Sequence, residues 1–171
     1  MTRKFTVIVT IIVMMVISRM LQAGSNEKQP ENQGHHDESH HHNHHIGLFG
    51  GFTNDLDGHN DFTLGLDYVY RLPVWEQRLG IGAFGEVIFA EHKEYLLGVP
   101  LMLKPAGNLF FVVAPGIVIV DEESTDNHFL FRLGAGYDIV LRNISLTPTV
   151  NLDFVEGEES LVFGISVGKG F

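Results

Sequence analysis

The feature that most constrains the fold is a strict alternation of apolar side chains with polar or glycine residues. In DFTLGLDYVYRL, residues 61–72, every second side chain is aromatic or aliphatic, and the positions between them include Thr63, Asp67 and Arg71. A period of two is that of a β-strand. The same pattern recurs in HFLFRLGAGYDI (128–139), ISLTPTVNLDF (144–154) and SLVFGISVGKGF (160–171). The chain is therefore predicted to be all-β.

The residues on the two faces of these segments indicate which face meets lipid. A strand of about 9–11 residues is long enough to span a bilayer when tilted. The apolar face is rich in Phe, Tyr and Leu, whereas the other face carries many glycines and few lysines, unlike the wetted face of a soluble sandwich. We therefore predict an antiparallel transmembrane β-barrel of eight strands, near residues 46–53, 61–72, 78–89, 94–104, 109–120, 128–139, 144–155 and 160–171.

The inward face of this predicted barrel carries charges of both signs. Buried charges are costly unless they are paired, so these side chains are expected to neutralise one another inside the barrel. Eight strands enclose a lumen only about wide enough for side chains to fill, and an open diffusion pore is not expected. The predicted lumen charge network consists of Arg71 and Arg132 with Asp67, Glu86, Asp138 and Asp153.

Two segments precede the predicted barrel domain of residues 46–171. Residues 1–23 have Arg3 and Lys4 ahead of an apolar run and end at Ala23, which is typical of a cleaved secretory signal peptide. A retained anchor is the alternative, but a spanning helix needs roughly 20 apolar residues and this run is shorter. Residues 24–45 contain almost no apolar side chain, and a disordered arm is expected there.

The connections between the predicted strands alternate in character. PVWEQ, KPAG and LRN are short, whereas NDLDGHND, EHKE, DEESTDN and EGEES are acidic. Outer-membrane barrels place their short turns in the periplasm, so the arm is expected in the periplasm and the acidic loops outside. Carboxylates there could hold calcium or magnesium near lipopolysaccharide, although polar loops are ordinary on barrels. The acidic loop residues are Asp55, Asp57, Glu91, Asp121, Glu122, Glu123, Asp126, Glu156, Glu158 and Glu159, with His59, His92 and His128 beside them.

Taken together, these segments resemble the small outer-membrane β-barrels of Gram-negative bacteria, of OmpA-like and OmpX-like size. FTLGLDYVYRL, YLLGVPLMLKPAGNLFFVVAPG, FRLGAGYDIV, PTVNLDF and LVFGISVGKGF are similar to uncharacterised proteobacterial barrels that often follow a histidine-rich arm. The resemblance covers residues 46–171 and concerns architecture, not activity. It implies that the barrel-assembly machinery reads the terminal aromatic, Phe171. Lys169 departs from the usual aromatic or apolar residue at its position and could extend its amine to the membrane interface.

The arm carries a dense group of histidines that could capture metal. Neutral imidazole is a good ligand for zinc, copper and nickel, and it loses this capacity when protonated near pH 6.5. The alternative is an inert solvated spacer. No cofactor is required for the predicted fold. The candidate ligands are His35, His36, His40, His41, His42, His44 and His45.

Other functions are disfavoured by what the chain lacks. It has no cysteine, which excludes disulfides and thiolate zinc sites, and its formal net charge of −10 disfavours nucleic acid. Resemblance to a lipid A deacylase would require a His and a Ser two residues apart on one strand. The residue two positions after His128 is Leu130, and Ser124 and Thr125 lie in a loop. We predict a non-enzymatic, monomeric outer-membrane protein with a structural or envelope role and with membrane lipid and lipopolysaccharide as partners. A narrow transport barrel is the main alternative, and a lipid-A-modifying enzyme is a weaker one.

Overall fold

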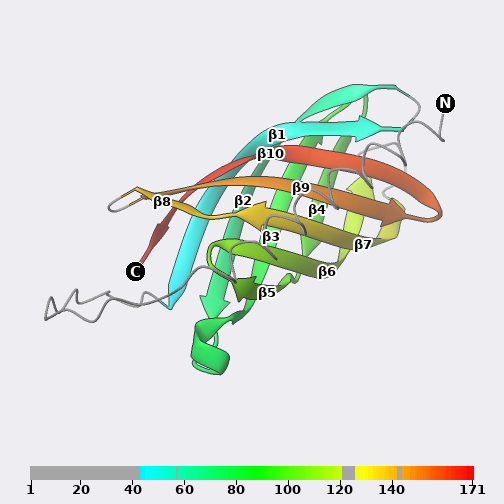
Figure 1. The fold of residues 1–171 in the computed structure, drawn as a ribbon. Coiled ribbons are helices and arrows are strands. Elements are labelled where there is room, and N and C mark those ends of the chain that lie inside the picture. Colours follow the sequence, from blue (N-terminus) through cyan, green and yellow to red (C-terminus); the bar gives the residue numbers. More distant parts are fainter. Residues whose placement is uncertain (1–42, 57, 121–125, 142–143) are drawn as a thin grey trace, which may run out of the picture. The chain divides into compact units, whose positions relative to one another are not determined.

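A computed structural model describes residues 43–56, 58–120, 126–141 and 144–171, which form one antiparallel sheet of ten strands (Figure 1). A short 3-10 turn, η1 (Trp75–Gln77), follows the second strand. No helix within these residues is long and apolar enough to cross a membrane. The strands are β1 (His44–Asp55), β2 (Asn60–Arg71), β3 (Leu79–Phe89), β4 (Lys93–Gly98), β5 (Leu101–Ala106), β6 (Leu109–Val120), β7 (Asp126–Tyr137), β8 (Ile139–Leu141), β9 (Ile144–Val155) and β10 (Glu158–Gly170).

The sheet closes on itself through its first and last strands. β1 pairs with β10 in a register that runs from His45 opposite Gly170 to Asp55 opposite Ser160, and Figure 1 shows these two strands side by side. β4 and β5 both pair with β3 and β6, while β7 and β8 both pair with β9. The ten described strands therefore occupy eight positions, and the predicted eight-stranded antiparallel barrel is confirmed.

The segment predicted as one strand at 94–104 is interrupted at Val99 and Pro100. Proline has no N–H to donate to the ladder, but the Pro100 carbonyl still accepts a bond from the Gly82 N–H at 3.0 Å. β5 then continues to Ala106, beyond the predicted end, and the chain turns at Gly107, whose φ is +57°. Most of the KPAG segment is therefore strand and not connection.

A second interruption separates β7 from β8 at Asp138, within the segment predicted as one strand at 128–139. The Asp138 N–H donates to the carbonyl of Asn108 at 2.9 Å, across the neighbouring turn, and the side chain of Asp138 is buried. Asp138 nevertheless keeps the inward facing that the alternation predicts, at one end of the barrel.

The first strand begins at His44, two residues before the predicted start of the barrel. The His44 N–H donates to the Phe171 carbonyl at 3.2 Å, and the Phe171 N–H donates back to the His44 carbonyl at 2.9 Å. The predicted arm includes residues 44 and 45 because histidine is polar. In the closed barrel, however, both residues pair with the chain at the end of β10. We call this the terminal end of the barrel, and the opposite end, with connections 56–59, 90–92 and 156–157, the acidic end.

Apolar side chains cover the outside of the barrel, as the alternation predicts. The lumen, however, is not filled by small and charged groups alone. A buried apolar cluster lies inside, towards the acidic end, and packs side chains from four adjacent strands. Its burial closes that half of the lumen to water. The cluster consists of Phe84, Ile88, Leu96, Ala114, Val118 and Leu130.

Candidate functional site in the barrel lumen

Arg132 on β7 lies at the centre of the lumen and is only 3% exposed. Its Nη1 and Nη2 donate to both carboxylate oxygens of Glu86, at 2.6 and 2.7 Å, and its Nε and Nη2 donate to both oxygens of Asp153 at the same distances. The guanidinium carbon lies 4.5 Å from the centre of the Phe84 ring. Two bidentate pairs saturate this cation, and the group carries one more carboxylate than it has cations. We call these three charged residues the central triad.

A second group of charges surrounds Asp138 at the terminal end. Its Oδ2 accepts from Lys104 Nζ at 2.6 Å and lies 3.3 Å from Arg71 Nη2, while Thr147 Oγ1 donates to Oδ1 at 3.1 Å. This terminal triad of Arg71, Lys104 and Asp138 carries one more cation than it has carboxylates. Lys104 is absent from the predicted network because it was assigned to a short connection. Its place two residues after the inward-facing Met102 is the signal that would have found it.

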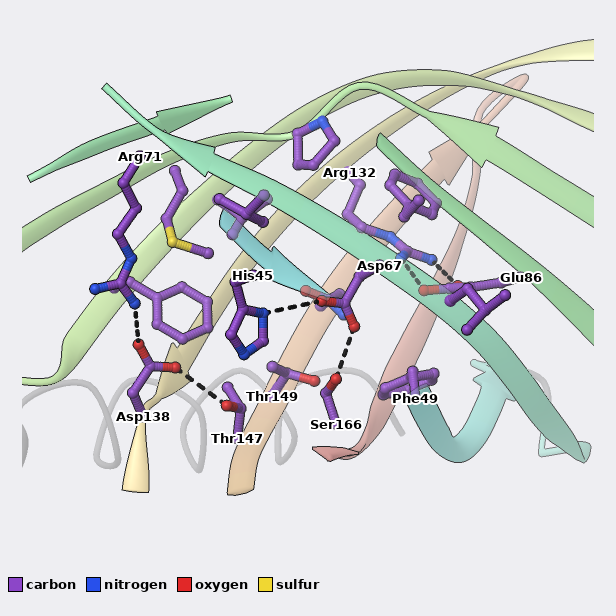
Figure 2. Close-up of a pocket in the computed structure, with 18 residues that line it drawn as sticks. His45, Phe49, Asp67, Arg71, Glu86, Arg132, Asp138, Thr147, Thr149 and Ser166 are labelled. Atoms are coloured by element: carbon purple, nitrogen blue, oxygen red, sulfur yellow. Dashed lines mark hydrogen bonds and ion pairs between the residues drawn. The ribbon is translucent and has the colours of Figure 1, made fainter. Parts of the chain in front are cut away.

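Asp67 on β2 stands between these two groups (Figure 2). Its Oδ2 accepts a hydrogen bond from Ser166 Oγ at 2.7 Å, and its Oδ1 lies 3.8 Å from His45 Nδ1. Gly47 on the adjacent strand gives this carboxylate its room, because a Cβ there would clash with Ser166 Oγ and lie 2.6 Å from Asp67 Oδ2. Of the predicted lumen charges, the structure therefore brings Glu86, Arg132 and Asp153 into one group, Arg71 and Asp138 into another, and leaves Asp67 apart.

The lumen between the central triad and the terminal end contains a cavity of about 110 Å³. Its lining mixes polar and apolar side chains. The apolar ones are Phe49, Leu66, Val69, Phe84, Pro100, Met102, Phe110 and Val112. Apart from Phe84, no residue of the buried apolar cluster lines the cavity. It is thus bounded on one side by the central triad and the apolar cluster beyond. Outside the two triads, the polar lining residues are His45, Asp67, Thr147, Thr149, Asn151 and Ser166.

Two of the seven candidate metal ligands lie within the described residues, and they point to opposite faces of β1. The His44 ring stacks on Phe171, with ring centres 5.5 Å apart, and its Nδ1 lies 2.7 Å from the Tyr68 hydroxyl. His45 faces the lumen. His35, His36, His40, His41 and His42 lie outside the described residues. Within the described residues, no group of three or more metal-ligating side chains is arranged to hold an ion.

Ser145, His45 and Asp67 lie next to one another in space in the same succession as the Ser, His and Asp of a hydrolase triad. His45 Nε2 lies 2.8 Å from Ser145 Oγ, but the 3.8 Å between Nδ1 and Asp67 is too long for a hydrogen bond. Ser145 is buried and pairs with Gly168 on one side and Val140 on the other, so the strand ladders engage the backbone around it. An acyl-transfer centre needs N–H donors aimed at the developing oxyanion. The arrangement is therefore that of a hydrogen-bonded lumen wall.

The acidic end gathers part of the predicted outer loop residues. Asp55, Glu91, Glu156, Glu158 and Glu159 are exposed there, as are His59 and His92. His128 Nδ1 lies 2.9 Å from Glu156 Oε1. Asp57, Asp121, Glu122, Glu123 and the side chain of Asp126 lie outside the described residues.

Comparison with solved structures identifies the fold. The chain matches Neisserial surface protein A with a TM-score of 0.54 and 13% identity, over 75% of this chain and 96% of that one. It matches the Yersinia pestis outer membrane protein Ail in a phospholipid bilayer nanodisc with a TM-score of 0.53 and 10% identity, over 76% and 99% of the chains. The protein has the fold of the small outer-membrane β-barrels. This barrel also matches the N-terminal β-barrel domain of Pseudomonas aeruginosa OprF, with a TM-score of 0.53 and 15% identity over 76% and 98% of the chains.

The same fold has been built by design, since the barrel also matches a de novo transmembrane β-barrel with a TM-score of 0.52 and 14% identity over 72% and 94% of the chains. No protein-family model matches the chain, and neither does any curated protein. At these identities the structural matches establish how the barrel is built, and the activity has to be argued from its own residues.

Proposed function

We propose that the protein is a non-enzymatic integral outer-membrane barrel with a structural or envelope role. The observation that supports this best is the apolar band on its outer surface, to which every position around the barrel contributes. In water, so extensive an apolar surface would drive aggregation, whereas lipid is its natural solvent. One exposed apolar residue from each position is Leu48, Leu66, Ile81, Leu97, Phe111, Leu133, Val150 and Ile165.

A closed lumen distinguishes this proposal from a channel. The central triad and the buried apolar cluster lie in series between the cavity and the acidic end. Breaking a bidentate pair of buried charges is costly, so thermal motion does not open this barrier readily. The narrow transport barrel is disfavoured for that reason, and the lipid-modifying enzyme is disfavoured by the geometry around Ser145.

Reconstitution into vesicles tests both the insertion of the barrel into a membrane and the closure of its lumen. When the denatured protein is diluted into phospholipid vesicles, we expect it to acquire β-sheet circular dichroism, to remain with the vesicles after an alkaline wash, and to leave them impermeable to small sugars. Release by the wash would contradict the integral barrel. Retention together with sugar-dependent vesicle swelling would contradict the closed lumen and favour the channel.

The proposed orientation places the terminal end in the periplasm. The supporting pattern is the charge of the connections, since the acidic ones lie at one end. Their lengths do not separate the two ends, because connection 72–78 at the terminal end is longer than 56–59, 90–92 or 156–157 at the acidic end. The acidic end would then face lipopolysaccharide, and the barrel-assembly machinery would read Phe171, whose ring is exposed beside His44. Lys169 is exposed on the lipid-facing side near the same end, where its amine can reach the membrane interface. The barrel is proposed to act as a monomer, without a required cofactor.

We further propose that residues 24–42 capture a divalent transition metal in the periplasm, with an inert spacer as the competing function. The support is the sequence alone, which places His35, His36, His40, His41 and His42 within a short segment. Several imidazoles on one chain can satisfy the coordination of zinc, copper or nickel. His44 and His45 belong to β1, where His44 stacks on Phe171 and His45 lines the lumen, so the proposal rests on the other five histidines.

Calorimetry with zinc, copper and nickel tests the arm. The processed protein is expected to bind at neutral pH and to lose binding as the pH falls below about 6.5, because protons compete for the imidazole nitrogens. A version without residues 24–42 leaves β1 intact and is expected to bind much more weakly. Equal affinities would reject the arm and direct attention to the acidic end.

A further inference from the structure

We propose that the cavity in the lumen binds a small aliphatic ammonium ion, with Asp67 as its anionic anchor. This site is distinct from the metal-capturing arm and from the structural role of the barrel. The charge balance of the lumen, the unpaired hydroxyl of Thr149, and the size and chemistry of the cavity walls support it.

The charge balance of the lumen leaves Asp67 without a permanent cation. The central triad carries one excess negative charge and the terminal triad one excess positive charge, so the two groups offset each other. Arg132 is saturated by two carboxylates, and Arg71 and Lys104 are both directed at Asp138. Within the described residues, the basic side chain nearest to Asp67 is His45, whose Nδ1 lies 3.8 Å from Oδ1. Histidine carries a positive charge only when it is protonated, so it is not a permanent cation. A partly buried carboxylate is stabilised by a nearby cation.

The geometry leaves part of Asp67 open to that cation. Oδ2 is occupied by Ser166, but Oδ1 has no partner within hydrogen-bonding distance among the described residues, and the side chain is 26% exposed on the cavity side of β2. Thr149 on β9, which also lines the cavity, has a buried Oγ1 without a hydrogen-bond partner. An ammonium group has three N–H donors. It can therefore satisfy Asp67 directly, and a hydroxyl acceptor such as Thr149 complements a second donor.

The size of the cavity and its apolar lining residues determine what the rest of the ligand can be. An engineered apolar cavity of about 150 Å³ accepts benzene, with its six carbon atoms. By that scale the 110 Å³ here suits roughly four to five non-hydrogen atoms. The apolar lining includes Phe84, which pairs with Asp67 across the β2–β3 ladder, together with Met102 and Phe110, and these side chains favour a short hydrocarbon chain over further polar groups. A butylammonium ion has this size and this division between a charged head and an apolar tail.

Nuclear magnetic resonance on the full processed protein in phospholipid nanodiscs tests the site with three probes: butylammonium, the neutral 1-butanol and the anionic butyrate. We expect saturable shifts of the Gly47 and Ser166 amide signals with butylammonium, and none with butyrate. Asp67→Asn keeps the size of the side chain and an acceptor for Ser166, and is expected to weaken butylammonium binding at least about tenfold. Glu158→Gln removes a carboxylate at the acidic end and is expected to leave the affinity unchanged.

A second variant covers the case in which Asp67→Asn perturbs the lumen. Thr149→Val keeps the shape of the residue, removes the hydroxyl and is expected to weaken binding severalfold. Equal affinities for butylammonium and 1-butanol would overturn the proposal, because an apolar cavity alone would explain them. Unchanged binding in Asp67→Asn, or no saturable shift with butylammonium at millimolar concentrations, would also overturn it. These outcomes leave the integral barrel itself unaffected, since vesicle reconstitution measures that separately.

Discussion

Replacement of Arg132 by methionine is expected to destabilise the barrel by about 3–5 kcal/mol. Methionine fills a similar volume but leaves the buried carboxylates of Glu86 and Asp153 close to each other without their shared cation. Loss of one partner from a buried ion pair is costly because the remaining charges are not solvated. Unfolding in urea, followed by circular dichroism in vesicles, measures the change in the free energy of unfolding.

Two further variants separate this effect from the loss of any arginine. Arg78→Met removes an exposed pair with Glu76 at 2.9 Å and is expected to cost only about 0–1 kcal/mol. Adding Glu86→Gln and Asp153→Asn to Arg132→Met removes the uncompensated charges and is expected to restore much of the stability. A small effect of Arg132→Met, or no recovery in the triple variant, would mean that the central triad does not hold the lumen closed.

Replacement of Leu133 by arginine is expected to cost about 2–4 kcal/mol and to impair assembly into the membrane. Leu133 points outward from β7 and is 41% exposed, so in a bilayer the new charge would meet hydrocarbon. Heat-dependent electrophoretic mobility reports the folded fraction, and urea titration in vesicles gives the free energy.

Ile144→Arg provides the matched control for depth. Ile144 also points outward, but it is the first residue of β9 at the terminal end, where an arginine can reach the interface and is expected to cost about 0–1 kcal/mol. Similar, small effects at both positions would indicate that water and not lipid surrounds the barrel. A soluble sandwich, the alternative that the alternation alone leaves open, would instead bury these aliphatic and aromatic side chains.

The strands, the direction in which their side chains face and their number around the barrel all follow from the amino-acid pattern. Alternation is a local property: Leu64 and Leu66 flank Gly65 and are exposed while the glycine is buried, because successive side chains of any strand point to opposite faces. The glycine-rich inward face further determined that lipid and not a protein core lies outside. These conclusions need no knowledge of which strand pairs with which.

The predictions for Lys104 and His45 were wrong because contacts with residues far away in the chain outweigh the local sequence pattern. Lys104 follows a broken strand and precedes Pro105, which is typical of a connection, but Asp138 binds it from another part of the chain. His45 belongs by composition to the histidine tract, yet the pairing of β1 with β10 and the contact with Ser145 hold it in the wall of the barrel. Polarity alone could not distinguish a lumen residue from an arm residue.

The division of the inward charges into groups, and the space between these groups, depend on how the closed barrel packs. Asp67 meets Ser166 across 99 positions of sequence, and Arg132 meets Glu86 across 46. Such contacts depend on the register at each ladder and on closure of the sheet, because a shift by one residue exchanges the inward and outward faces of a strand. The charges of the lumen can therefore be predicted from the sequence, but their partners cannot. In the closed barrel Arg132 binds two carboxylates, Lys104 and Arg71 both bind Asp138, and Asp67 lines a cavity.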